Sequence, residues 1–367
     1  MMRMRLNEIC EVYSGYALKS FNDSEVGLPV VKIGNILTDG TLNLDECQYT
    51  TDCVNEKYYS NKDDIYIALS GATIGKIGIM DADERYVVNQ RVGIVRKKSD
   101  DVPQEYIKYF LLKQTNRILQ EAAGCAQPNI SPKQIAEYSV PEVSKEKMFE
   151  VCIVLDAIKR IIDMRKAELI ALDNLIKARF VEVFGNPVSN SFGLPEATLP
   201  ELGEFGRGVS KHRPRNDPKL LGGEYPLIQT GDVANAGLYI TSYNSTYSEL
   251  GLKQSKMWDK GTLCITIAAN IAKTAILEFD ACFPDSVVGF TANEKTSNVF
   301  IHYWFSFFQA ILESQAPESA QKNINLKILS ELKVIVPEKE KQNEFVEFIN
   351  QVDKSKFVKP KRAFYRQ

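Results

Sequence analysis

The sequence predicts an α+β protein with two repeated domains, each built of short twisted β-sheets plus helices, separated by two long helices packed as an antiparallel coiled coil. Three observations lead to this fold class. The 367-residue chain repeats a series of sequence blocks. Each copy contains short β-branched runs bounded by Gly, Asp or Asn. The segment Ser144–Phe184 contains neither Gly nor Pro. At about 150 residues a domain, the length agrees with two domains and connecting helices.

The internal repeat consists of five blocks that occur in the same order in both halves. Their separation stays between 194 and 197 residues, which is far longer than the period of a solenoid repeat. The paired blocks are 28–36 with 225–233, 64–79 with 261–276, 88–95 with 284–291, 126–131 with 320–325, and 140–141 with 336–337. A duplicated domain therefore accounts for most of the chain.

Each copy contains the same series of expected elements. The runs IYIALSG and TLCITIA, at 65–71 and 262–268, predict buried strands. KIGIM and KTAILEF, at 76–80 and 273–279, predict their partner strands. One amphipathic helix is expected to follow in each copy, over Pro103–Leu119 and Asn298–Leu312.

The segment Ser144–Phe184 predicts a helix about 60 Å long. Ser144 is a suitable N-cap residue, and Gly185-Asn186-Pro187 supplies the stop. Its apolar residues alternate at spacings of four and three, with Arg165 and Arg179 in the two remaining positions, which indicates a heptad seam and a coiled-coil partner. The seam residues are Val151, Leu155, Ile158, Ile162, Leu169, Leu172, Ile176 and Val183. A single surface helix on one domain is the alternative.

A second helix of about half that length is expected from Glu338. Phe345, Ile349 and Val352 continue the heptad spacing, and Pro360 should end the helix near Val358. We expect the two helices to pack antiparallel. The predicted division is domain 1 at 1–143, the central helix at 144–185, domain 2 at 186–337, and a C-terminal helix and tail at 338–367.

Composition excludes several classes of protein. The net charge is −2, so any contact with nucleic acid must use local basic patches. No apolar run approaches about 18 residues, and the N-terminal sequence has no apolar stretch typical of a signal peptide, so we expect a cytoplasmic protein without membrane contact. Seven cysteines without a CxxC motif and only two histidines argue against a metal site. We expect reduced thiols, and a metal or disulfide shared by Cys47 and Cys53 is the alternative.

Every catalytic motif that the sequence suggests is incomplete, so we expect no catalytic residues and no enzyme activity in this chain. Gly71–Lys76 is one residue short of a phosphate-binding loop. Phe205–Gly208 lacks the surroundings of a methyl-donor loop, and Asn186-Pro187-Val188 lacks the second proline and the aromatic residue of an amine methyltransferase motif. Pro284-Asp285 with Glu331 and Lys333 leaves an unusually long gap for a nuclease motif.

The remaining candidates are basic and amide side chains in loops, where they suit phosphate contacts and readout of base edges. The most basic loop is Gly206–Asp217, and its counterpart in the first copy is Gly15–Asp23. A solvated loop, and a structural role for the amides that recur in both copies, are the alternatives. The candidate DNA-binding residues are Tyr16, Lys19, Ser20, Asn89, Gln90, Arg91, Gln127, Asn129, Arg207, Lys211, His212, Arg213, Arg215, Lys322 and Asn323.

Together these blocks resemble the specificity (S) subunits of type I restriction–modification systems. GYALKS, LPVVKIGNI, DIYIALSGATIGKIGI, NQRVGIV and AQPNIS resemble one target-recognition domain, and GRGVSKHRPRND with YPLIQTGDV resembles the second. The resemblance covers essentially the whole chain, including the order of domains and helices.

The resemblance implies a non-catalytic subunit whose two domains each read one half of a bipartite DNA target. The helices would fix the spacer and dock modification subunits that carry S-adenosylmethionine and methylate adenine. Restriction subunits would bring ATP, Mg²⁺ and nuclease activity, and this chain would hold no cofactor. The short second helix departs from the family pattern, so a truncated or silent allele that acts as a half-site or dimeric DNA-binding or scaffold protein is the alternative.

Overall fold

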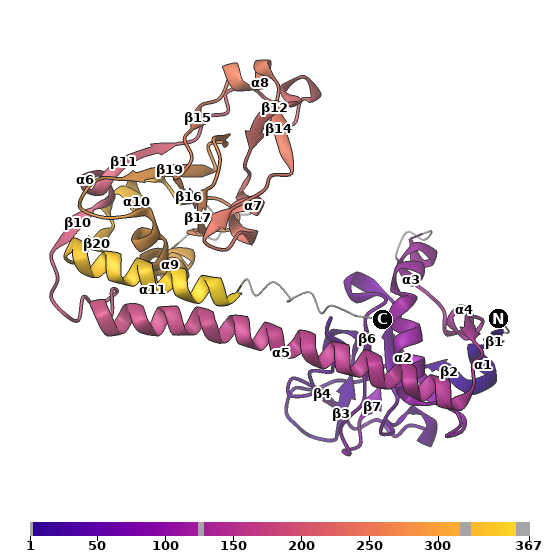
Figure 1. Ribbon diagram of the computed structural model, residues 1–367. Coiled ribbons are helices and arrows are strands. Elements are labelled where there is room, and N and C mark those ends of the chain that lie inside the picture. Colours follow the sequence, from indigo (N-terminus) through magenta and orange to yellow (C-terminus); the bar gives the residue numbers. More distant parts are fainter. Residues whose placement is uncertain (1–2, 124–127, 316–323, 357–367) are drawn as a thin grey trace, which may run out of the picture. The chain divides into compact units, whose positions relative to one another are not determined.

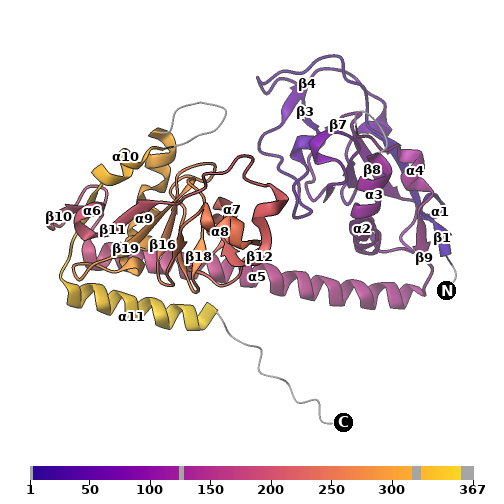
Figure 2. The same ribbon diagram turned by 90° about the horizontal axis from the view of Figure 1, so that it is seen from above.

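The computed structural model describes residues 3–123, 128–315 and 324–356. The chain forms two compact units, Met1–Met164 and Arg165–Gln367. The division falls inside the longest helix, α5 (Lys145–Phe184). Figures 1 and 2 show the elements of each unit from two directions.

The first unit is built on a four-stranded antiparallel sheet. Its strand order is β2 (Cys10–Ser14), β8 (Val92–Lys97), β5 (Ile65–Ala68) and β6 (Ile77–Ile79). A three-stranded sheet has the order β4 (Gln48–Thr50), β3 (Leu28–Val31) and β7 (Val87–Val88), and β1 (Arg3–Arg5) pairs with β9 (Ser139–Pro141). The other elements are α1 (Leu6–Ile9), η1 (Ile33–Asn35), η2 (Glu56–Tyr58), η3 (Gly71–Thr73), α2 (Gln104–Lys113), α3 (Thr115–Ala122) and α4 (Pro132–Ala136).

Strand β5 is buried on both faces, because successive side chains point to opposite sides of a sheet. Ile65 and Ile67 belong to a hydrophobic cluster formed with the helices of this unit. Tyr66 and Ala68 belong to a second cluster formed with the three-stranded sheet. The apolar run predicted to be a strand therefore lies between two layers.

The second unit repeats this plan. Its five-stranded sheet has the order β11 (Gly203–Arg207), β19 (Val287–Ala292), β16 (Leu263–Thr266), β17 (Thr274–Leu277) and β13 (Tyr239–Ile240). The four-stranded sheet has the order β14 (Ser245–Tyr247), β12 (Leu221–Leu227), β18 (Ala281–Cys282) and β15 (Met257–Trp258), and β10 (Glu196–Thr198) pairs with β20 (Lys333–Ile335). The remaining elements are α6 (Leu199–Leu202), η4 (Pro218–Leu220), α7 (Thr230–Asn235), α8 (Glu249–Lys253), α9 (Asn298–Gln315), α10 (Leu326–Glu331) and α11 (Lys339–Lys356).

The duplication predicted from the sequence is confirmed by the strand order. The series β2-β8-β5-β6 in the first unit corresponds to β11-β19-β16-β17 in the second. Leu263 and Ile265 of β16 face the helical cluster, whereas Cys264 faces the smaller sheet, as in β5. In Figure 1, α9 lies between the five-stranded sheet and α11. The α+β fold class is thereby confirmed.

The prediction of one continuous helix after the first sheet was wrong. Pro103–Leu119 was expected to form a single helix, but α2 ends at Lys113 and α3 begins at Thr115. The hydroxyl of Thr115 donates to the carbonyl of Leu112, 2.9 Å away, and competes for a backbone acceptor of the last turn. The second copy has no such interruption in α9.

The bounds of α5 agree with the prediction to one residue. The hydroxyl of Ser144 accepts from the amide of Lys147 at 3.3 Å, as an N-cap residue does. Gly185 follows the last helical residue with φ of 76°, a conformation that favours glycine.

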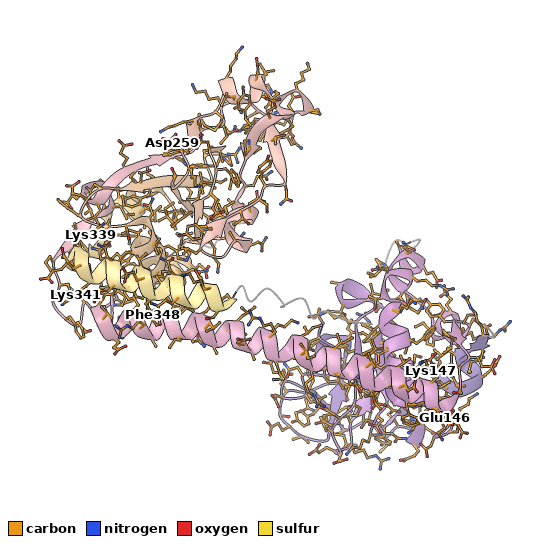
Figure 3. The ribbon with its side chains drawn as sticks, in the orientation of Figure 1. Glu146, Lys147, Asp259, Lys339, Lys341 and Phe348 are labelled. Carbon is orange, nitrogen blue, oxygen red and sulfur yellow. The ribbon has the colours of Figure 1, made fainter. Side chains whose placement is uncertain are left out.

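In the second unit, α11 runs antiparallel to the Arg165–Phe184 part of α5 (Figures 1 and 2). Phe345, near the start of α11, lies 5.4 Å from Phe180 between ring centroids. Lys356, at its end, forms an ion pair with Asp173 at 2.8 Å. Figure 3 shows Phe348 of α11 between the two helices, where the guanidinium of Arg179 lies 5.8 Å from its ring. The predicted antiparallel pairing is confirmed over this stretch.

The residues that fill this helix contact differ from a regular heptad seam. Ile176 is buried as expected, but the other fully buried residues of α5 here are Phe180 and Phe184, which the seam omits. Val183, Leu169 and Leu172 are only half-buried. The ring of Phe180 contacts Phe184, Phe300, Phe307 and Phe345. Because aromatic residues of α9 and α11 pack here, the buried face of α5 differs from the predicted heptad seam.

In the first unit, α5 is covered along one face only. Met148 and Cys152 are buried, Val151 and Leu155 are half-buried, and Asp156 accepts a hydrogen bond from the hydroxyl of Tyr109. The opposite face carries large exposed apolar side chains, which we call the exposed face of α5. Its members are Ile153, Val154, Ile158, Ile161, Ile162 and Met164. Among the described residues no helix is both long and apolar enough to cross a bilayer.

Candidate nucleic-acid interface

In both units the candidate loop begins with a glycine that packs directly against the backbone of another segment where the two cross. Gly15 packs against Val88, and Gly208 packs against Pro284. A Cβ atom on Gly15 would lie 2.2 Å from the carbonyl oxygen of Val88, and one on Gly208 would lie 2.4 Å from that of Pro284. These are contacts that no other residue could make without a shift. The two crossings bring each candidate loop beside the turn before β8 or β19.

Three candidates of the first unit meet at this crossing. Gln90, Arg91 and Asn129 line one cavity of about 450 Å³, together with Ser14, Ser70 and Gly71. Asn129 forms a bridge with Ser70, and the side chains of Gln90, Arg91 and Asn129 are exposed. Such a group offers amide and guanidinium donors at one open site.

Asn89 has a structural role at the same turn. It is buried, and its Oδ1 atom accepts from the amide of Arg91 at 3.1 Å. This hydrogen bond stabilises the turn and occupies the side-chain oxygen of Asn89. The observation favours the structural role that was the alternative to DNA contact for this residue.

The other candidates of the first unit are spread along its loop. The amide of Lys19 and the hydroxyl of Ser20 both donate to Asp52, at 2.7 and 3.2 Å. The backbone of Tyr16 joins the crossing, since its amide donates to Val88 and its carbonyl accepts from Gln90. The ring of Tyr16 packs against Tyr58, with centroids 5.2 Å apart.

The basic loop of the second unit converges on one carboxylate. Nη2 of Arg213 lies 3.4 Å from Oδ2 of Asp285, and Nη2 of Arg215 pairs with Oδ1 of the same residue. Arg207 donates from Nε to the backbone carbonyl of Asp285. Three of the predicted basic residues therefore surround Asp285, a residue whose only signal in the sequence is an incomplete nuclease motif.

The guanidinium of Arg213 is also anchored within its own loop. It donates from Nη1 to the carbonyls of Ser210, at 2.6 Å, and His212, at 2.9 Å. Arg215 borders a cavity of about 240 Å³ that Gln229, Thr230 and Ser286 also line. The site thus combines fixed donors with adjoining open space.

Lys211 and His212 lie apart from this cluster. Their backbone amides donate to Gln254, and the ring of His212 lies 3.1 Å from Asp217. Gln127, Lys322 and Asn323 lie outside the described residues, so their placement as DNA contacts remains a prediction.

The described residues offer little catalytic chemistry. Among them, no group of three or more His, Cys, Asp or Glu side chains could hold a metal ion. The two carboxylates of the incomplete nuclease motif are each engaged with a cation, since Asp285 binds arginines and Glu331 pairs with Lys327. Cys47 and Cys53 are both free thiols. Burial raises the pKa of Cys10 to about 12 and that of Cys152 to about 11, so these thiols are poor nucleophiles.

Comparison with known proteins gives consistent matches along the chain. The family model described as the type I restriction modification DNA specificity domain matches residues 1–174 and again 196–362. The specificity subunit of the type I restriction enzyme EcoBI from Escherichia coli is 21% identical over 384 residues, which cover 96% of this chain and 79% of that protein. A Methanocaldococcus jannaschii protein, named provisionally as the MjaX specificity subunit, is 21% identical over 95% of this chain and 85% of its own length.

Solved structures show the same fold. The S subunit of a type I restriction–modification system from M. genitalium aligns with a TM-score of 0.53 at 15% identity, over 97% of this chain and 90% of that one. A chain from a structural study of type I complex assembly aligns with a TM-score of 0.54, also at 15% identity and over the same shares of the two chains.

Proposed function

This chain belongs to the family of type I restriction modification DNA specificity domains and contains two copies of that domain, and from this premise we propose how it reads DNA. Each unit binds one half of a bipartite duplex target at the place where its loop crosses the turn before β8 or β19. The main supporting observation is that exposed polar donors lie beside the loop crossing in both units. They are Gln90, Arg91 and Asn129 in the first unit and Arg213 and Arg215 in the second. Two different donor sets predict two different half-sites.

The geometry favours base readout in the second unit. Arginine guanidiniums match the two acceptors on the major-groove edge of guanine, and Arg213 and Arg215 present theirs from one loop. Contacts to phosphate supply the affinity that does not depend on sequence. Because the chain carries a net charge of −2, partner subunits would supply a large share of those phosphate contacts.

We assign the helices to subunit docking and to spacing of the half-sites. The exposed face of α5 carries six large apolar residues on a continuous helix, and exposed apolar surface of this kind is typical of protein contacts. Modification subunits carrying S-adenosylmethionine would bind there and methylate adenine. Restriction subunits would contribute ATP, Mg²⁺ and nuclease activity, so that this chain itself acts without a cofactor.

Sequencing of adenine methylation in the host genome tests this function. Deleting the gene for this chain should abolish methylation at one split motif, and reintroducing the unchanged chain should restore it. The motif would give both half-sites and the spacer length. Methylation of every motif at its original level after deletion, in cells that express a modification subunit, would overturn the proposal.

A further inference from the structure

Asp285 is the shared acceptor of two arginines of the second unit, Arg213 and Arg215. Its two carboxylate oxygens each pair with a different guanidinium, that of Arg213 and that of Arg215. The carboxylate is half-buried, with 30% of its side chain exposed, whereas the arginine side chains are 55% and 44% exposed. It therefore lies beneath two cations whose outer surfaces stay open to solvent.

The equivalent position in the first unit lacks this charge. The amide of Leu69 donates to the carbonyl of Arg91, and that of Ile267 donates to the carbonyl of Ser286, so Gln90, one residue before Arg91, corresponds to Asp285. An uncharged amide side chain is thus sufficient at this turn in the first unit. The acidic side chain in the second unit requires a different explanation, and the arginine pairs provide it.

Resting on the DNA-reading function proposed above, we propose that Asp285 is a specificity-determining residue of the second unit. Its carboxylate holds Arg213 and Arg215 in a fixed arrangement and neutralises one of their two positive charges. Phosphates of arbitrary sequence must then compete with an internal anion for these guanidiniums. A base edge with two acceptors, such as that of guanine, replaces both oxygens of the carboxylate at once and so competes better than a single phosphate oxygen.

The substitution Asp285→Asn tests this role, because it removes the charge and preserves the shape. Arg207 still has its acceptor, which is the backbone carbonyl of residue 285. The full chain should bind a mixed-sequence 30-base-pair duplex about three- to tenfold more tightly than the unchanged chain at low salt. The plot of log affinity against log salt should become steeper by about 1 to 2, as expected when one or two more phosphates are neutralised.

Two further variants separate this effect from a general change in charge. Asp259 is an exposed residue that follows β15 (Figure 3). The substitution Asp259→Asn also removes one negative charge from the chain, but it should raise the affinity for DNA much less. Adding Arg213→Ala and Arg215→Ala to Asp285→Asn should remove the gain. Melting curves of all variants check that each remains folded.

The outcomes distinguish this inference from the proposed function. Equal affinity and salt dependence for Asp285→Asn and Asp259→Asn would overturn the role of Asp285 while leaving DNA binding in place. Failure of the unchanged chain to bind the duplex, both alone and with its modification subunit, would overturn the proposed function and this inference together. In cells, Asp285→Asn should broaden methylation in one half of the split motif only, and unaltered stringency in both halves would contradict the inference.

Discussion

The guanidinium of Arg165 donates a hydrogen bond to the backbone carbonyl of Lys356, the last residue of α11, across a distance of 2.5 Å. A second bond reaches the carbonyl of Ser355 at 3.3 Å. In the predicted heptad seam of α5, Arg165 occupies a position that is otherwise apolar. The structure instead gives it a helix-capping position, because the last carbonyls of a helix lack partners within the helix and favour a nearby positive charge.

Replacing Arg165 with alanine should loosen the last turn of α11. The lost bonds contribute about 1 kcal/mol, so hydrogen exchange at the amides of residues 353–356 should accelerate about fivefold. The exposed Arg160 provides a matched control for removal of one arginine from α5. Equal protection of α11 in Arg165→Ala and Arg160→Ala would show that the cap contributes nothing.

His302 should make the second unit sensitive to mild acid. The pKa of His302 is lowered to about 4, chiefly by burial and to a smaller degree by the nearby charge of Lys356, against an opposing hydrogen bond with Thr274; Thr274 lies 3.0 Å from its Nδ1 atom. In the unfolded chain a histidine has a pKa of about 6.5. The unfolded chain therefore binds a proton between pH 6.5 and 4 that the folded chain does not, and the free energy of unfolding falls as the pH decreases through this range.

The full shift corresponds to about 3 kcal/mol, but the ring is only half-buried, so we expect a loss of about 1 to 2 kcal/mol. Urea unfolding at pH 7 and pH 4.5 measures it, and the variant His302→Gln should lose correspondingly less stability between the two pH values. Carboxylates also titrate here, so the informative quantity is the difference between the variant and the unchanged chain. His212→Gln, in an exposed loop, is the control, and identical behaviour of the two variants would contradict the prediction.

Much of the fold could be predicted because it depends on local patterns. The β-branched run around Ile65 and the absence of Gly or Pro from Ser144 to Phe184 specify a strand and a helix with no information from distant residues. The burial of Phe180 could not be predicted in the same way. A heptad pattern assumes one partner helix, whereas Phe180 meets rings from both α9 and α11.

The candidate site was predictable in its residue types but not in its connections. Arg213 and Arg215 were identified because a loop with several cations is visible in the sequence. Their acceptor, Asp285, lies about 70 residues farther along the chain. It reaches them only because Gly208 permits the loop to cross beside β19, which is a property of the tertiary structure.

The double variant Arg213→Ala, Arg215→Ala should lose discrimination in one half of the DNA target. A bidentate contact to a base contributes about 1 to 3 kcal/mol of discrimination, so methylation at the split motif, relative to sites altered in that half, should fall by about 5- to 150-fold in a complex that still assembles. The comparison is Lys327→Ala, Lys333→Ala, which removes two exposed cations from α10 and β20. Full methylation by the arginine variant would show that this loop does not read DNA.

The exposed face of α5 provides the sharpest test of subunit docking. Ile158 and Ile162 are 48% and 49% exposed, so changing both to aspartate should alter the stability of this chain by no more than about 1 kcal/mol. If a modification subunit covers them, the same change places two charges in an apolar contact, which costs several kcal/mol. Co-purification of a tagged modification subunit with the variant should then be lost. Val26→Asp with Val188→Asp, at residues 58% and 47% exposed, introduces the same charges elsewhere and should leave assembly intact. Equal recovery of the modification subunit with both double variants would exclude this face as its docking surface.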